Sequence, residues 1–237
     1  MSCSSSTTKT YLSIDVDYWS SRHTDWDQSV REMWYMFDRV VKSGVPVTMV
    51  LDHHELLEDP NINECNKLIN VDYHSDITNY FDEDGEIKYI EYGTDAYCKA
   101  ELNCGTWVNF LPWRSTGEFL WCYPESECFS ATVRQANYGR CEDVDGFWDK
   151  PKSKHHNWNY ISCVRGWQYK VDWRNVTAVG VSMSVEWLQE YLETHFIWNV
   201  YPKLEANGVI VSDSFLEYLS WLGGDDNKEL DCRYSCR

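Results

Sequence analysis

Three short apolar segments, each followed at once by acidic or histidine residues, constrain the fold of this 237-residue chain more than any other feature. The first segment leads into Asp15 and Asp17, the second spans residues 45–51 before Asp52, and the third ends at Asp72. The second segment is a continuous apolar run, which is typical of a strand buried on both faces of a parallel sheet, and the other two read as short strands. Because ligands bind at the carboxyl ends of such strands, the pattern predicts that these side chains share one site.

Helices are predicted between the first two of these segments and near the C-terminus. Apolar side chains over residues 28–43 share one helical face. Nearer the C-terminus, a strand is predicted over 176–184 and a helix over 185–198, with Trp187 on its buried side. A last helix is predicted from residue 212 or 213 to 222. The alternation of strands and helices predicts an α/β fold with a mainly parallel sheet.

The length and composition are those of a single globular domain. Hydrophobic residues make up 43% of the chain and charged residues 25%, which is outside the range of disordered proteins. We expect a disordered N-terminus over residues 1–10, one catalytic domain over 11–224 and a polar C-terminal tail over 225–237. Residues 77–175 are rich in Trp, Tyr and Cys and show little clear period.

The formal charge of -17 limits the partners of the protein. Such a surface repels nucleic acids and anionic lipids and attracts metal ions or basic peptides. The alternative explanation is that the acidic residues only keep the protein soluble. The sequence has no run of about 18 apolar residues, so no membrane span is expected. The first ten residues are polar and show no secretory signal, which predicts a cytoplasmic protein with reduced cysteines. For Cys232 and Cys236, in the polar tail, a disulfide or adventitious metal binding stays open as an alternative.

The first motif places two carboxylates close together. If Asp15 and Asp17 lie on one strand, they point to the same face. Two carboxylates on an apolar strand repel each other and are unfavourable to bury, and a divalent cation removes that penalty. The alternative interpretation is a strand end with exposed acidic residues.

The second motif, Asp52-His53-His54-Glu55, directly follows the apolar run of residues 45–51. Four polar or ionisable side chains in a row after a buried strand are typical of a ligand site. The alternative is the solvated start of a helix, in which Asp52 is the N-cap and Glu55 completes a capping box.

The third motif, Asp72-Tyr-His74-Ser-Asp76, is the most specific of the three. In an extended chain its alternation places two carboxylates and one imidazole on the same side. Hard oxygen ligands mixed with imidazole suit Mn²⁺, Fe²⁺ or Zn²⁺ better than Ca²⁺. The three motifs together predict a metal centre.

These motifs are similar to those of a known enzyme family. The D-Y-H-S-D run of residues 72–76 resembles the D-A-H-x-D motif of arginases and other ureohydrolases, and the S-I-D-V-D run of residues 13–17 resembles their S-x-D-x-D motif. Asp52 and His53 are similar to the Asp-His pair of their G-G-D-H-S motif, although apolar residues replace the two glycines. The strings around these motifs, together with residues 107–113, resemble a divergent branch that includes the bacterial peptide arginases.

The resemblance implies an arginase-like three-layer α/β/α fold and two bound Mn²⁺ ions. The motif order is permuted, since the S-x-D-x-D strand comes last of the three in arginases and first here. The implied ligands are Asp15 and Asp72 bridging both ions, His53 and Asp76 completing the set of one ion, and Asp17 and His74 completing that of the other.

Further residues are assigned roles by the same resemblance. The candidates for proton transfer to the leaving amine are His54, His23, His155 and His156. Glu186 is the candidate that holds the guanidinium group, although it also suits the first turn of a helix. Trp107 and Asn109 are expected either to line the site or to belong to a packed loop.

The implied reaction is hydrolysis of the guanidinium group of peptidyl arginine by a metal-bridging hydroxide, giving peptidyl ornithine and urea. The expected partner is an arginine-containing precursor peptide that is ribosomally made and modified, and the sequence leaves the oligomeric state open. Two alternatives remain. One is another binuclear-metal ureohydrolase or amidohydrolase that acts on a small guanidino or acylated-amine substrate. The other is a non-catalytic acidic interaction protein with a vestigial metal site.

Overall fold

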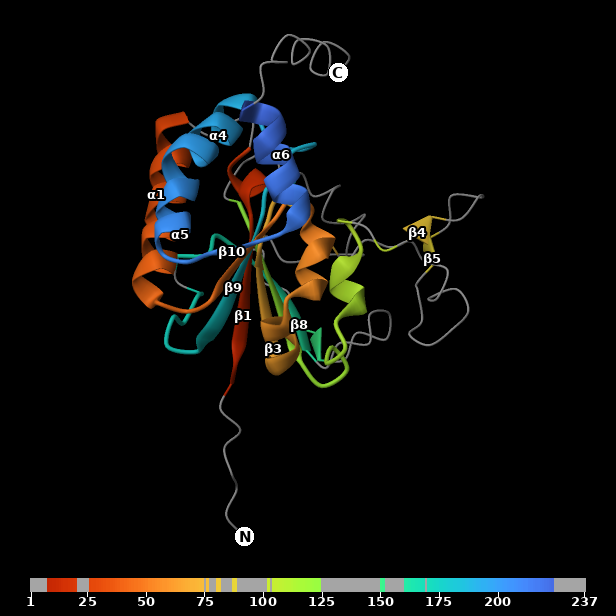
Figure 1. Cartoon of the computed structure of the whole chain (residues 1–237). Coiled ribbons are helices and arrows are strands. Elements are labelled where there is room, and N and C mark those ends of the chain that lie inside the picture. Colours follow the sequence, from red (N-terminus) through yellow and green to blue (C-terminus); the bar gives the residue numbers. More distant parts are fainter. Residues whose placement is uncertain are drawn as a thin grey trace.

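The structure is a computed structural model that describes residues 8–20, 26–74, 76, 80–81, 87–88, 102, 104–124, 150–151, 160–168 and 170–223. One eight-stranded sheet, with the order β10-β2-β9-β1-β3-β6-β8-β7, forms the centre of the described part (Figure 1). Its strands are β1 (Thr10–Asp15), β2 (Val47–Val50), β3 (Lys67–Val71), β6 (Glu118–Tyr123), β7 (Lys150–Pro151), β8 (Tyr160–Arg165), β9 (Val176–Ser182) and β10 (Ile210–Val211). All neighbouring strands are parallel except β7 and β8. The prediction of an α/β fold with a mainly parallel sheet is therefore confirmed.

Helices cover one face of the sheet and short 3-10 segments cover the other (Figure 1). The helices are α1 (Trp26–Ser43), α4 (Glu190–His195), the π-helical η5 (Phe196–Val200), α5 (Tyr201–Ala206) and α6 (Asp213–Gly223). The short segments on the other face are η2 (His53–Glu58), η3 (Pro60–Glu64) and η4 (Trp107–Phe110). A separate antiparallel pair consists of β4 (Tyr80–Phe81) and β5 (Ile87–Lys88).

Strand β1 lies between the two layers, and its alternating side chains divide between them. Leu12 and Ile14 belong to the large apolar cluster beneath the helices, whereas Tyr11 belongs to the cluster beneath the 3-10 segments. By the period of two, Ser13 and Asp15 share the face of Tyr11. Both are buried, so the strand carries polar groups directly into the interior on the 3-10 side.

The parallel register brings the ends of the central strands to one level. Ile14 of β1 pairs with Val71 of β3, and Asp15 pairs with Ser182 of β9. Val50, the last residue of β2, also pairs with Ser182. The residues after β3 therefore emerge beside Asp15, and those after β2 emerge at the same edge of the sheet, on the far side of β9.

Two of the predicted helices are found where they were expected, and one differs. Helix α1 ends at Ser43 and α6 ends at Gly223, but the helix predicted from residue 185 begins only at Glu190. The reason is a turn after β9, in which Ser184 has a φ of 43° and the Trp187 N–H donates to the Ser184 carbonyl at 2.9 Å. The prediction that Trp187 is buried is therefore wrong, because 56% of this residue is exposed.

The boundaries of the expected domain agree with the described elements only in part. Strand β1 begins at Thr10, one residue inside the segment that was expected to be disordered. The expected tail over 225–237 lies outside the described residues, as do His23, His155 and His156. None of the described helices has the length and apolar character needed to span a membrane.

Candidate metal centre

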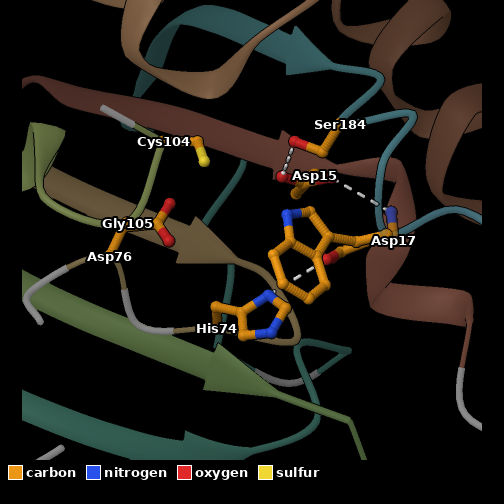
Figure 2. A pocket seen from close by; sticks show the side chains of 8 residues that line it. Asp15, Asp17, His74, Asp76, Cys104, Gly105 and Ser184 are labelled. Atoms are coloured by element: carbon orange, nitrogen blue, oxygen red, sulfur yellow. Dashed lines mark hydrogen bonds and ion pairs between the residues drawn. The ribbon is translucent and has the colours of Figure 1, made fainter.

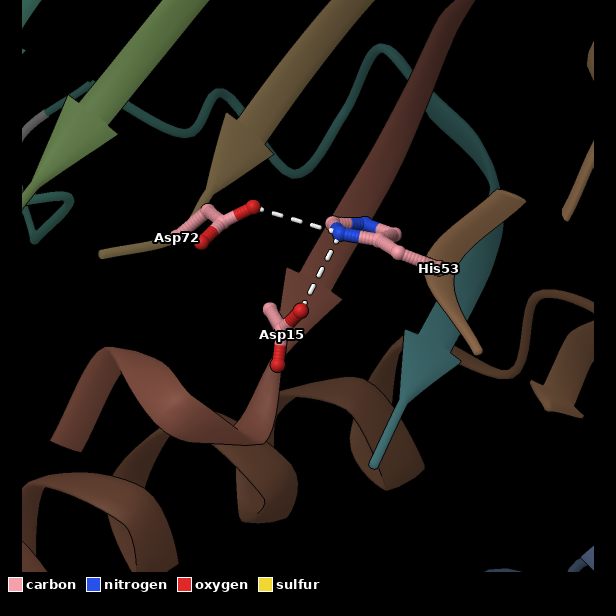
Figure 3. Close-up of side chains that lie close together, drawn as sticks. All are labelled: Asp15, His53 and Asp72. Atoms are coloured by element: carbon pink, nitrogen blue, oxygen red, sulfur yellow. Dashed lines mark ion pairs between the residues drawn. The ribbon is translucent and has the colours of Figure 1, made fainter. Parts of the chain in front are cut away.

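The three motifs meet at the carboxyl ends of β1, β2 and β3. Asp15 is the last residue of β1, Asp72 comes directly after β3, and His53 begins η2 two residues after Leu51 (Figure 3). Asp76 lies four residues beyond Asp72 and is also buried. The side chains of Asp15, His53 and Asp72 point toward one another in Figure 3, although they come from three separate segments.

The imidazole of His53 forms the centre of this group. Its Nδ1 lies 3.1 Å from Asp15 Oδ2, 3.2 Å from Asp72 Oδ2 and 2.7 Å from Asp76 Oδ2. None of these contacts has the direction of a hydrogen bond, and Nδ1 has no hydrogen-bond partner although the side chain is 1% exposed. A cation bound between an imidazole nitrogen and carboxylate oxygens requires these atoms to face one another in this way, without hydrogen bonds between them.

The other nitrogen of the same ring has a partner that suits metal binding. His53 Nε2 lies 2.6 Å from the buried hydroxyl of Ser13. When Nε2 carries the proton and donates it to Ser13, Nδ1 keeps its lone pair for a metal. The indole of Trp107 packs against the ring, with 4.7 Å between ring centroids. These two contacts fix the orientation of the imidazole.

A second group of possible ligands shares Asp72 with the first. His74 Nδ1 lies 3.1 Å from Asp17 Oδ2, and the His74 backbone N–H donates to Asp72 Oδ1 at 2.7 Å. The ligand atoms of Asp17, Asp72 and His74 lie within 4.8 Å of one another, and so do those of Asp15, His53 and Asp72. The structure therefore offers two adjacent sets of three ligands that share Asp72, and Asp76, which is in neither set, lies against His53.

Asp17 reaches the site by a route that differs from the expected one. The strand ends at Asp15, whose Oδ1 accepts a hydrogen bond of 3.0 Å from the Asp17 N–H and so starts the 3-10 turn η1 (Val16–Trp19). The prediction that both carboxylates lie on one face of a strand is therefore wrong. The alternative of exposed acidic residues is also wrong, because Asp15 and Asp17 are 3% and 1% exposed.

Burial and repulsion from neighbouring carboxylates raise the pKa of Asp17 and of Asp72 and so favour their neutral forms. Burial, together with the carboxylates of Asp15 and Asp72, raises the pKa of Asp17 well above its ordinary value. Burial, together with Asp76 and Asp15, raises the pKa of Asp72 to about 8. Four buried carboxylates this close cannot all carry charge without cations. The centre therefore has to hold either protons or metal ions.

The two histidines supply part of the positive charge that this cluster attracts. Burial disfavours the charged form of His53, but Asp76 and the other carboxylates outweigh it and raise the pKa. Burial opposes protonation of His74 as well, and the contact with Asp17 still raises its pKa to about 10. Both imidazoles would exchange these protons for a divalent ion, so metal and protons compete for the same atoms.

Three side chains outside the ligand set hold the carboxylates in place. The Ser184 hydroxyl donates to Asp15 Oδ2 at 2.5 Å, and the Asn70 amide donates to Asp72 Oδ2 at 3.1 Å. The Trp107 N–H donates to an oxygen of Asp76 at 2.6 Å. Asp76 and Ser184 are also the described non-glycine residues with positive φ, at 55° and 43°. Strained backbone of this kind is concentrated at functional sites, where the surrounding contacts maintain it.

Two of these supporting roles were not anticipated from the sequence. Asn70 lies two residues before Asp72, so the alternation of β3 places it on the side of that ligand, and this signal was available. Ser184 lies 169 residues from Asp15 along the chain, and no local pattern indicates their contact. Trp107, which was expected either to line the site or to belong to a packed loop, is fully buried and contacts two of the proposed ligands.

A pocket of about 180 Å³ opens beside the ligands (Figure 2). Its described lining consists of Asp15, Asp17, His74, Asp76, Cys104, Gly105, Ser184 and Trp187. Burial raises the pKa of the Cys104 thiol, which keeps it neutral. The pocket thus has carboxylates and an imidazole at one end and an exposed indole as a further wall.

The remaining predicted residues lie outside the two ligand sets. Glu186 is exposed, on the turn after β9, and does not line the pocket. His54 is half-buried, and its Nδ1 has no hydrogen-bond partner. The Asp52 side chain makes no capping hydrogen bond to η2, and Glu55 accepts one from Ser214 instead. A 3-10 helix does begin here with Asp52 at its N-cap position, as the alternative interpretation expects, but the capping box is not formed.

Comparisons with known proteins give no relative. No family model, no characterised protein and no solved structure matches this chain. The likeness to the arginases therefore rests on the three sequence motifs. The activity of the protein has to be inferred from the chemistry of the site.

Proposed function

We propose that this protein is a metal-dependent hydrolase of the arginase superfamily that releases urea from the guanidinium group of arginine within a peptide. In this proposal two Mn²⁺ ions bind at the carboxyl ends of the central strands. The six ligands would be Asp15, Asp17, His53, Asp72, His74 and Asp76.

The main support for this proposal is the environment of the buried Nδ1 of His53. It faces oxygens of Asp15, Asp72 and Asp76 within 3.2 Å and has no hydrogen-bond partner. Without a cation this nitrogen can meet the carboxylates only as an ion-paired imidazolium, which leaves part of the buried negative charge uncompensated. A cation at this point would satisfy the nitrogen and the carboxylates together.

The ligand types support a pair of ions that carries out hydrolysis. Four carboxylates and two imidazoles around two divalent ions would give a centre close to neutral. Oxygen and imidazole ligands together suit Mn²⁺, Fe²⁺ or Zn²⁺, and Mn²⁺ is the choice that the motif resemblance favours. When bound, such ions supply a water molecule whose pKa is lowered toward neutrality.

The chain itself would position the substrate and move the proton. The pocket beside the ligands places a bound group next to His74 and Asp76. His54 remains the proposed donor of a proton to the leaving amine, because its free Nδ1 adjoins the ligand His53 along the chain. Glu186 remains the proposed partner of the guanidinium group, from the exposed turn after β9.

A peptide is a better candidate for the substrate than free arginine. Among the described residues that line the pocket, His74 is the only one that can carry a positive charge. A free amino acid needs such a group for its α-carboxylate, whereas an arginine within a peptide has no such carboxylate. The net charge of -17 also favours a basic peptide.

The test combines metal analysis with urea release. The purified protein should bind two Mn²⁺ ions per chain and release urea from a peptide with a central arginine, at a kcat/KM well above that for free arginine. Asp38→Asn is the matched control, because Asp38 is an exposed carboxylate on α1 that pairs with Lys42. Absence of both bound metal and urea release would overturn the proposal. Hydrolysis of an acylated amine without urea release would place the protein among amidohydrolases.

A further inference from the structure

Trp187 is exposed at a position where the apolar spacing predicts burial. It stands on the turn after β9 and lines the pocket with 56% of its surface exposed. Its ring centroid lies 5.3 Å from that of His74. Other exposed Trp side chains of the described part, such as Trp26 and Trp198, do not line this pocket. An indole held beside the proposed ligands and open to solvent is placed to contact a bound molecule.

The turn that presents Trp187 is built into the metal centre. Ser184 has a φ of 43°, its carbonyl accepts a hydrogen bond of 2.9 Å from the Trp187 N–H, and its hydroxyl donates to Asp15. Ser184 therefore both holds the proposed ligand Asp15 and sets the backbone conformation at the start of the turn. The position of the indole relative to the ligands is set by this turn.

When two divalent ions are bound, little net negative charge would remain at the centre to attract the cationic group of a substrate. Two divalent ions would offset the charges of the four carboxylates, including the three that line the pocket (Figure 2). The Cys104 thiol is neutral, and the Ser184 hydroxyl is occupied by Asp15. An aromatic face attracts a cation without a net charge of its own, and it does so more strongly where water is partly excluded. Trp187 is the aromatic side chain in the described lining.

We infer that Trp187 is the specificity-determining residue of this pocket, and that its indole holds the cationic end of a substrate side chain beside the metal centre. The inference rests on the proposed function for the reaction, but the recognition of a cation can be measured without turnover. A planar guanidinium group can stack on the ring, and its exposed face also accommodates the aliphatic part of the side chain. A neutral aliphatic side chain with the same number of carbons gains only the apolar contact.

Binding is tested with blocked tripeptides that carry lysine or norleucine at the centre, so that no guanidinium group is hydrolysed. Dissociation constants are measured by calorimetry with the Mn²⁺-loaded protein. The unaltered protein should bind the lysine peptide more tightly than the norleucine peptide. Trp187→Leu should weaken binding of the lysine peptide by about 3- to 30-fold, and Trp187→Phe by less, because a benzene ring keeps part of the attraction.

Two controls separate this role from a structural one. Trp198→Leu removes an exposed indole that does not line the pocket and should leave both dissociation constants unchanged. The bound Mn²⁺ per chain should be the same in Trp187→Leu as in the unaltered protein. Equal binding of the lysine peptide by Trp187→Leu, or equal losses for the lysine and norleucine peptides, would overturn the inference.

Turnover then distinguishes failure of the inference from failure of the proposed function. With an arginine peptide, Trp187→Leu should raise KM more than it lowers kcat. If the unaltered protein binds the lysine peptide through Trp187 but releases no urea, the proposed reaction is wrong and the recognition of a cation stands. If urea is released and Trp187→Leu leaves KM unchanged, the inference is wrong and the reaction stands.

Discussion

The indole N–H of Trp107 donates a hydrogen bond of 2.6 Å to Asp76 Oδ2, and the same oxygen lies 2.7 Å from His53 Nδ1. The Trp107 ring also packs against the His53 ring. One fully buried side chain therefore fixes two proposed ligands that come from different segments. Outer contacts of this kind orient ligands, and their loss commonly lowers metal affinity by roughly 10- to 100-fold.

We predict that Trp107→Phe weakens Mn²⁺ binding by roughly 10- to 100-fold, because it removes the donor to Asp76 and keeps a ring against His53. Competition with a chelator measures this affinity. Trp113→Phe is the matched control, since the Trp113 indole donates to the carbonyl of Ile62, away from the ligands. If both variants lose the same affinity, the effect comes from packing and not from the Asp76 contact.

Asp72 is the ligand that the two sets share, and its loss should affect both ions. We predict that Asp72→Asn reduces bound Mn²⁺ from two ions per chain to none and abolishes turnover, whereas Asp17→Asn retains one ion. The physical reason is that Asp72 turns one oxygen toward His53 and the other toward the backbone of His74. Metal analysis of the folded variants, with circular dichroism to check the fold, gives the result. Two ions retained by Asp72→Asn would contradict the shared-ligand assignment.

The strands and the meeting of the motifs were accessible from the sequence for a simple reason. An apolar run that is buried on both faces is a local signal, and neighbouring parallel strands all end at the same edge of the sheet. That rule places Asp72 beside Asp15 and the end of β2 at the same edge, beyond β9, and the start of η2 then brings His53 into contact with both carboxylates. The position of the candidate ligands therefore follows from where β1, β2 and β3 end.

The parts that sequence reasoning missed depend on contacts between distant segments or on local backbone strain. The spacing around Trp187 is that of a buried helical residue, but the positive φ of Ser184 ends the strand in a turn and leaves the indole exposed. Asp17 lies on a 3-10 turn because the Asp15 carboxylate caps its N–H. In both cases a local turn overrides the period of the sequence.

The stability of the metal-free protein should fall as pH rises. The pKa of Asp72 is raised from 3.8 to about 8, and that of His74 from 6.5 to about 10. Between these values the folded state keeps protons that the unfolded state has released, so the free energy of unfolding decreases with pH. Asp72 contributes to this loss up to about pH 8, and His74 contributes from about pH 6.5 to 10.

Mn²⁺ should oppose this trend, because a bound ion requires the same groups to be deprotonated. We predict that the difference in Tm between protein with Mn²⁺ and protein with a chelator widens as pH rises from about 6.5 to 8. Thermal unfolding followed by fluorescence at several pH values measures it. Asp38→Asn should show the same widening as the unaltered protein. A difference in Tm that does not change with pH would mean that the metal does not displace these protons.

The exposed position of Glu186 limits how much its carboxylate can contribute to substrate binding. Glu186 precedes Trp187 along the chain, and its carboxylate is close enough to Asp52 to contribute to the raised pKa of that group, after burial and Glu55. A charge pair in solvent is typically worth at most about 1 kcal/mol, which corresponds to about a 5-fold change in an equilibrium constant.

We therefore expect Glu186→Gln to raise KM for an arginine peptide by about 2- to 5-fold with little change in kcat, and the effect should shrink as salt rises. Glu190→Gln is the control, since Glu190 is an exposed carboxylate at the start of α4, outside the pocket lining. Steady-state kinetics at low and high salt test this expectation. A much larger loss that is insensitive to salt would mean that the turn closes over the substrate and buries Glu186 against the guanidinium group. No change in KM at either salt concentration would remove Glu186 from the site and leave recognition of the cation to Trp187.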